Sequence, residues 1–62
     1  MFDLTHDDCQ LLIATHYEAA KARMGDDTHL IASQILCWTG LGSPGNLEAL
    51  ENEIETTNHL SK

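Results

Sequence analysis

The first third of the chain has the apolar spacing of a helix. Residues recur at steps of three and four from Cys9 onward and fall on one stripe, which consists of Leu12, Ile13, His16, Ala20 and Met24 with Tyr17 at its edge. Thr5 followed three residues later by Asp8 resembles a capping box, and Gly25 suits a left-handed C-cap. The pattern therefore predicts a helix from near Thr5 to near Met24.

The middle of the chain predicts a second and more deeply buried helix. Asp26 or Asp27 can cap it, and within residues 30–38 only Ser33 and Gln34 are polar. Two nearly opposite faces are partly apolar: Ile31, Ile35 and Trp38 on one, and Leu30, Ser33 and Cys37 on the other. We expect the first face to be mostly buried. Because the helix has apolar surface for more than one neighbour, a neighbour can come from outside the chain, as another protein or as a second copy in a homodimer.

A turn and a third helix are predicted for the remainder. Residues 39–46 contain three glycines and the only proline, which ends the second helix. Ser43 and Asn46 are alternative caps for a third helix, whose apolar row is Leu47, Leu50 and Ile54, continued by Thr57. The pattern is lost from Thr56 onward, so we expect the last few residues to fray.

These elements indicate an all-α fold. No segment alternates apolar and polar residues between turn signals as a half-buried strand requires. A chain of 62 residues is too short to enclose two cores. We therefore predict a single small helical domain over residues 1–62, in which an antiparallel helical hairpin is crossed by a third helix.

The charge balance excludes several classes of partner. The chain has three Lys and Arg against ten Asp and Glu, and its formal net charge is -7. Direct binding to nucleic acid or to an anionic membrane surface is therefore disfavoured. No apolar run approaches the length of about 20 residues that a membrane span needs, and the first residues do not read as a signal peptide. We expect a cytoplasmic protein whose two cysteines, Cys9 and Cys37, are reduced and pack between the first and second helices.

Histidine and cysteine on the first helix are the candidate metal ligands. His6, Cys9 and His16 share one side of that helix, and Cys37 can approach from the second. Structural zinc sites bring their ligands in close pairs, and His6 with Cys9 is the only such pair, so we expect no metal or other cofactor. A thiolate at Cys9 is opposed by the two preceding aspartates, and the chain carries no catalytic motif, so we expect no enzymatic activity. A metal-binding protein is kept as a third hypothesis.

The segment from Ile35 to Leu50 combines a helix end, a Gly-apolar turn and a capped helix. This layout resembles the helix-turn-helix of repressor-type DNA-binding domains, which implies that the third helix is a recognition helix. Here, however, that helix carries no Lys or Arg before Lys62, and it carries four acidic residues, Glu48, Glu51, Glu53 and Glu55. It repels phosphates, so such a geometry would serve protein binding instead.

An acidic row is the alternative functional feature. Glu48, Glu51 and Glu55 lie on one side of the third helix, at axial steps of about 4.5 Å and about 6 Å. This spacing is similar to that of successive phosphates and suits a nucleic-acid mimic that occupies a basic groove of a DNA- or RNA-binding protein. The alternative is an ordinary solvated face that keeps a small protein soluble.

The remaining interpretation is a small acidic, non-enzymatic protein-binding module. In size and charge it resembles the regulatory or inhibitory accessory proteins of bacteria and their phages. We expect it to bind another protein through an apolar helical surface. A few aromatic anchors usually dominate such interfaces, and the only aromatic residues other than histidine are Phe2, Tyr17 and Trp38.

Overall fold

The computed structural model describes residues 3–60, the last two as backbone only. The described part consists of three helices and no strand: α1 (His6–Met24), α2 (Thr28–Thr39) and α3 (Pro44–Leu60). The predicted all-α, three-helix fold is confirmed. Phe2 lies outside the described residues.

Local caps set the limits of α1. Thr5 Oγ1 accepts a hydrogen bond from the Asp8 backbone N–H at 3.2 Å, and Asp8 Oδ2 accepts one from the Thr5 N–H at 3.3 Å, so the predicted capping box is confirmed. At the other end Gly25 has φ of 75°, and its N–H donates to the Lys21 carbonyl. The ψ of -140° differs from that of a left-handed helical cap and turns the chain toward α2.

The structure decides between the alternative caps of α2 and α3. Asp27, and not Asp26, caps α2 by accepting a hydrogen bond from the Leu30 N–H at 3.1 Å. Ser43, and not Asn46, caps α3, because Ser43 Oγ accepts from the Asn46 N–H at 3.2 Å. Pro44 then occupies the first helical position, where its missing N–H costs nothing.

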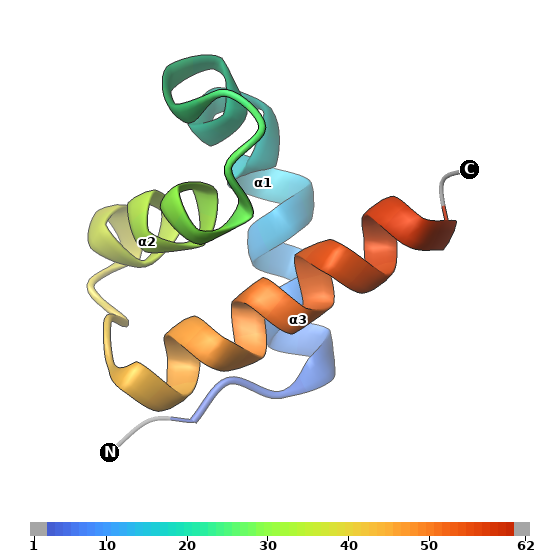
Figure 1. The fold of residues 1–62 in the computed structure, drawn as a ribbon. Coiled ribbons are helices and arrows are strands. Elements are labelled where there is room, and N and C mark those ends of the chain that lie inside the picture. The colour runs from blue at the N-terminus through green and yellow to red at the C-terminus, as the bar shows by residue number, and fades with distance from the viewer. Residues whose placement is uncertain (1–2, 61–62) are drawn as a thin grey trace.

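The three helices cross one another around one core. In Figure 1, α3 passes in front of α1, and α2 runs across the direction of α1. The two helices therefore do not form the antiparallel hairpin expected from their short connection. The core takes residues from all three helices, which are Cys9, Ala20, Ile31, Ala32, Ile35, Leu36, Leu50 and Ile54. None of the described helices has the length and apolarity that a membrane crossing demands.

Two expectations about α2 are wrong. Ile31 and Ile35 are buried as predicted, but Trp38 is 40% exposed. The ring lies at the edge of the core, beside His16 and Arg23 of α1, because the buried contacts of α2 are made by its other apolar side chains. Cys37 is also exposed, whereas Cys9 is buried as expected. The two cysteines therefore do not pack together between α1 and α2.

The end of α3 is more regular than its pattern suggests. The helix continues through Leu60, past Thr56 where the apolar spacing is lost. The Thr56 hydroxyl donates to the Asn52 carbonyl within the helix, and Gln10 of α1 donates to the Thr57 hydroxyl at 3.5 Å. Polar contacts thus replace the missing apolar ones over this turn.

Candidate functional site

Trp38 is an exposed aromatic ring in contact with two side chains of α1. The centroid of its ring lies 6.0 Å from that of His16, at an interplanar angle of 46°. The guanidinium carbon of Arg23 lies 5.7 Å from the Trp38 ring centroid, within the range of a cation–π interaction. Both partners belong to α1, so the ring is positioned by a neighbouring helix while 40% of the residue stays accessible.

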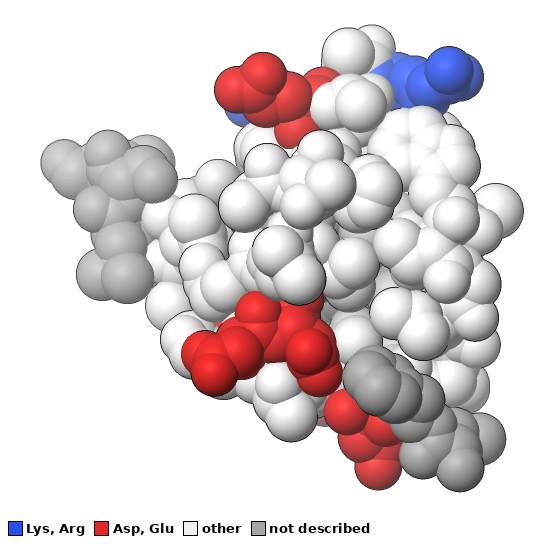
Figure 2. Space-filling model, turned by 180° about the vertical axis from the view of Figure 1, so that it is seen from behind, with Lys and Arg blue, Asp and Glu red and all other residues white. Residues whose placement is uncertain are grey.

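Trp38 belongs to a broad surface formed by two segments of sequence without charged residues. The sequence has no Asp, Glu, Lys or Arg from 9 to 17 in α1, nor from 28 to 47, a range that includes all of α2. Seen from the side away from α3, the molecule shows a wide uncharged area, with acidic groups at its upper edge beside the basic ones and again in the lower part of the view (Figure 2). Such a large uncharged area on a chain with ten carboxylate side chains is a candidate interaction surface.

Helical geometry relates Leu11 to this surface. His16 lies on the side of α1 that faces Trp38. Ala19, Thr15 and Leu11 lie successively farther around the outside of the helix, and Leu11 is about 140° from His16 around the helix axis. Leu11 on that outer side is 66% exposed. On the surface between Trp38 and Leu11, Thr15 and Ala19 are exposed, while Leu12 and His16 are half-buried. We call this surface the Trp38 face, defined by Leu11, Leu12, Thr15, His16, Ala19 and Trp38.

Tyr17 lies on a different side of α1. Its hydroxyl donates to Asn58 Oδ1 at 3.4 Å, and Lys21 Nζ lies 5.9 Å from its ring centroid. The half-buried ring borders a small hollow of about 220 Å³ between α1 and α3. The structure therefore does not bring Tyr17 and Trp38 onto one surface, and Phe2 is not described.

The predicted acidic row is partly engaged in contacts within the protein. Glu48 and Glu55 are exposed, but Glu51 pairs with His29 Nδ1 of α2. Glu53, which sequence reasoning left outside the row, faces α1. The carboxylates of α3 thus point to both neighbouring helices as well as to solvent.

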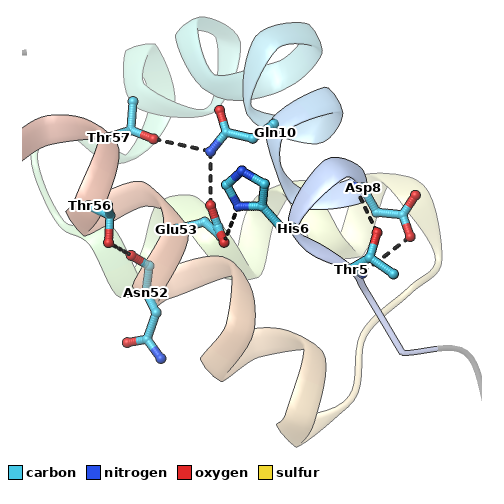
Figure 3. A network of polar contacts seen from close by, with 8 residues as sticks. All are labelled: Thr5, His6, Asp8, Gln10, Asn52, Glu53, Thr56 and Thr57. Carbon is cyan, nitrogen blue, oxygen red and sulfur yellow. Dashed lines mark hydrogen bonds and ion pairs between the residues drawn. The ribbon is translucent and has the colours of Figure 1, made fainter. Parts of the chain in front are cut away.

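Glu53 is the centre of a polar network between α1 and α3 (Figure 3). His6 Nδ1 lies 2.9 Å from Glu53 Oε2, and Gln10 Nε2 donates to Glu53 Oε1 at 2.9 Å. The hydrogen bond and charge of Glu53 raise the pKa of His6 above its ordinary value of 6.5. The hydrogen bonds from His6 and Gln10 lower the pKa of Glu53 below its ordinary value of 4.5. The network joins the first turns of α1 to the middle of α3.

The candidate metal ligands are directed to different neighbours. His6 contacts Glu53 of α3, Cys9 is buried in the core, and His16 contacts Trp38 of α2. Over residues 3–58, no three His, Cys, Asp or Glu side chains gather closely enough to hold a metal ion. Burial, followed by the charges of Glu53 and Asp8, raises the pKa of the Cys9 thiol. Cys9 is thus an apolar core residue with a protonated thiol.

A second hollow, which the sequence pattern did not indicate, lies between α2 and the start of α3. Its volume is about 390 Å³, and its walls are mostly apolar. The residues that line it are Ser33, Leu36, Cys37, Gly42, Ser43, Pro44 and Leu47. One feature of the sequence could have indicated both this hollow and the position of Trp38, namely the absence of Asp, Glu, Lys and Arg from 28 to 47. The spacing of apolar residues alone does not reveal this feature.

The arrangement offers a binding surface whose exposed side chains are apolar. Leu11 and Trp38 are exposed apolar side chains, and the nearby histidine and arginine are already in contact with the Trp38 ring. Comparison of the chain with protein-family models, with characterised proteins and with solved structures finds no match.

Proposed function

We propose that this chain is a non-enzymatic protein-binding module, acting in the cytoplasm as a regulatory or inhibitory accessory protein of bacterial or phage type. The observation that carries this proposal is the Trp38 face, where Leu11 and Trp38 are 66% and 40% exposed and the six residues that define the face are all uncharged. Exposure of an apolar patch to water is unfavourable in free energy, and such patches commonly mark protein interfaces.

The physical chemistry of Trp38 supports this role. Tryptophan is among the residues that contribute most to protein interfaces, because its ring removes a large apolar area from water. Here the contacts with His16 and Arg23 restrict the ring before a partner arrives. A restricted side chain loses less conformational entropy on binding, so each contact contributes more to affinity.

The nucleic-acid mimic is the competing proposal. It requires Glu48, Glu51 and Glu55 to face a basic groove together, yet Glu51 already pairs with His29. A mimic that uses this row has to release that pair or to bind with two exposed carboxylates in place of three. The two proposals place the interface on opposite parts of the molecule, which makes them separable by substitution.

The test compares variants of the immobilised chain as baits in a lysate of its native cells. We expect a protein that the wild type retains to be retained by the Glu48→Gln, Glu51→Gln, Glu55→Gln variant and lost with Leu11→Ser. Leu11 is the substitution of choice because it is the more exposed of the two apolar residues, so its loss costs little stability. Circular dichroism of each bait controls for folding.

The aromatic residues predicted as anchors are compared in the same assay. Trp38→Ala should weaken retention, with Phe2→Ala and Tyr17→Ala measured beside it, and each anchor should cost more than about 1 kcal/mol. Retention that survives Leu11→Ser and all three aromatic substitutions but disappears with the triple glutamate variant would replace this proposal by the mimic.

A further inference from the structure

The hollow of about 390 Å³ between α2 and the start of α3 shares no residue with the Trp38 face. We call it the α2–α3 hollow. Its walls are Ser33, Leu36 and Cys37 of α2, residues 42–43 of the turn, and Pro44 and Leu47 of α3. At 1.5 Å per residue, residues 33–37 extend about 6 Å along α2. The hollow is therefore too short to seat a helix, whose anchors extend over two or more turns.

The turn beside the hollow is fixed by hydrogen bonds within the chain. Gly40 ends α2 at φ of 71° and ψ of 19°, and the Leu41 N–H donates to the Leu36 carbonyl at 3.2 Å. The buried Asn46 side chain donates to the Leu41 carbonyl at 2.8 Å, and Ser43 Oγ accepts a hydrogen bond from the Asn46 N–H. Because these walls are already ordered, little conformational entropy is lost when a ligand binds.

The surroundings of the α2–α3 hollow favour an uncharged ligand. Each residue of the described chain that lines it is uncharged. One helical turn away on each helix, His29 and Glu51 pair with each other. Glu48 is exposed and does not line the hollow. Transfer of a charged group from water to apolar walls without an opposite charge is unfavourable, and the net charge of -7 further opposes an anion.

The Ser33 hydroxyl is a polar group that the hollow offers to a ligand. Ser33 is half-buried, and within residues 3–58 no protein group forms a hydrogen bond with its hydroxyl. Ser43 Oγ differs, because it already accepts the Asn46 N–H as the cap of α3. A ligand hydroxyl or carbonyl group that bonds to Ser33 is thereby oriented against the apolar walls.

We propose that the α2–α3 hollow binds an uncharged, mainly apolar small molecule of two-ring size, with one hydroxyl or carbonyl group held by Ser33. Ligand pockets combine apolar walls with a few polar groups, and their volumes begin at about 300 Å³. An apolar cavity of about 150 Å³ holds one benzene ring, so a hollow of about 390 Å³ suits two fused rings. This site does not depend on the function proposed for the Trp38 face.

Three probes test the ligand class on the full chain. Naphthol is uncharged and has two rings, naphthoate has the same rings with a carboxylate, and phenol has one ring. Binding is followed by two-dimensional NMR spectra of the backbone amides. We expect naphthol to shift amide signals from 33 to 47 saturably, with a dissociation constant below about 1 mM, and the other two to bind about tenfold more weakly. Equal affinity of naphthoate or phenol, or shifts that do not saturate, would overturn the proposal.

Matched substitutions locate the site. Ser33→Leu fills the hollow and should weaken naphthol binding about tenfold or more, whereas Thr15→Leu, the same kind of change at an exposed position of α1, should not. Ser33→Ala is a smaller change that a helix tolerates, and loss of its hydrogen bond should weaken binding about fivefold. Unchanged affinity in a folded Ser33→Leu variant rejects the hollow, and unchanged affinity in Ser33→Ala rejects the role of its hydroxyl.

The Cys37 thiol separates this ligand from other occupants. Cys37 is exposed and lines the hollow, so bound naphthol should slow its reaction with a chromogenic disulfide reagent in proportion to occupancy. A rate that falls as the protein concentration rises, without the probe, would assign the hollow to a second copy. Affinity for N-acetyltryptophanamide equal to that for naphthol would assign it to a tryptophan side chain of another protein. Either result overturns the proposal.

Discussion

The side-chain oxygen of Asn46 accepts a hydrogen bond from the backbone N–H of Leu4 at 3.0 Å, across 42 positions of sequence. The amide nitrogen of the same side chain donates to the Leu41 carbonyl at 2.8 Å. Asn46 is 3% exposed and lies in the first turn of α3. One buried amide thus connects the segment before α1 with the turn between α2 and α3.

Asn46→Ala should destabilise the protein by about 1 to 3 kcal/mol, because the N–H of Leu4 and the carbonyl of Leu41 lose their side-chain partner. Urea unfolding measures the change. Asn52→Ala is the matched control, since Asn52 is an exposed asparagine on the same helix. Equal stability of the two variants would mean that the Asn46 bonds contribute nothing beyond those of a solvated amide.

Truncation of Ile35 should cost about 2 to 5 kcal/mol, since Ile35 is fully buried and Ile35→Ala leaves a cavity in the core. A small domain has little surplus stability, so the variant should be largely unfolded at room temperature. Leu11→Ala, a similar truncation at a 66% exposed position, should leave the melting temperature nearly unchanged. A cooperative melt of Ile35→Ala close to that of the wild type would contradict the assignment of α2 as the centre of the core.

The two thiols should differ in accessibility. Cys37 is exposed and Cys9 is buried, and burial also raises the pKa of the Cys9 thiol. A chromogenic disulfide reagent should therefore titrate one thiol per native chain rapidly and the second only in denaturant. Cys37→Ser should remove the rapid phase, and a rapid phase that persists in this variant would place Cys9 at the surface.

The His6–Glu53 pair should give stability a specific pH dependence. The pKa of His6 is raised, so its contribution is fully present below the ordinary value of 6.5 and is lost as the pH rises through the raised pKa. The pKa of Glu53 is lowered, so its contribution is present above the ordinary value of 4.5 and is lost as the pH falls through the lowered pKa. The pair therefore stabilises the fold most between these two ordinary values.

Titration of the histidine ring protons by NMR checks this assignment. Glu53→Gln should lower the pKa of His6, whereas Glu48→Gln, which removes an exposed charge from the same helix, should not. Melting temperatures at about pH 6 and about pH 8 should differ less in His6→Gln than in the wild type. An unchanged pKa of His6 in Glu53→Gln would show that the pair does not form in solution.

The helices and most of their ends follow from the sequence, because the signals are local. The capping box of Thr5 and Asp8 and the end at Gly25 concern residues within one turn of one another. The choice between Ser43 and Asn46 was not local. Asn46 is buried against Leu4 and Leu41, and this long-range demand leaves Ser43 as the cap.

The candidate site depended on tertiary structure to a greater degree. The sequence alone determined that Ile31, Ile35 and Trp38 lie near one another on α2, and that residues 28–47 carry no charge. Only the packing decided that Ile31 and Ile35 enter the core while Trp38 stays at its edge beside His16. The periodicity of a helix defines which residues share a face. Burial depends on how far neighbouring helices extend over that face, and in this protein they leave 40% of Trp38 exposed.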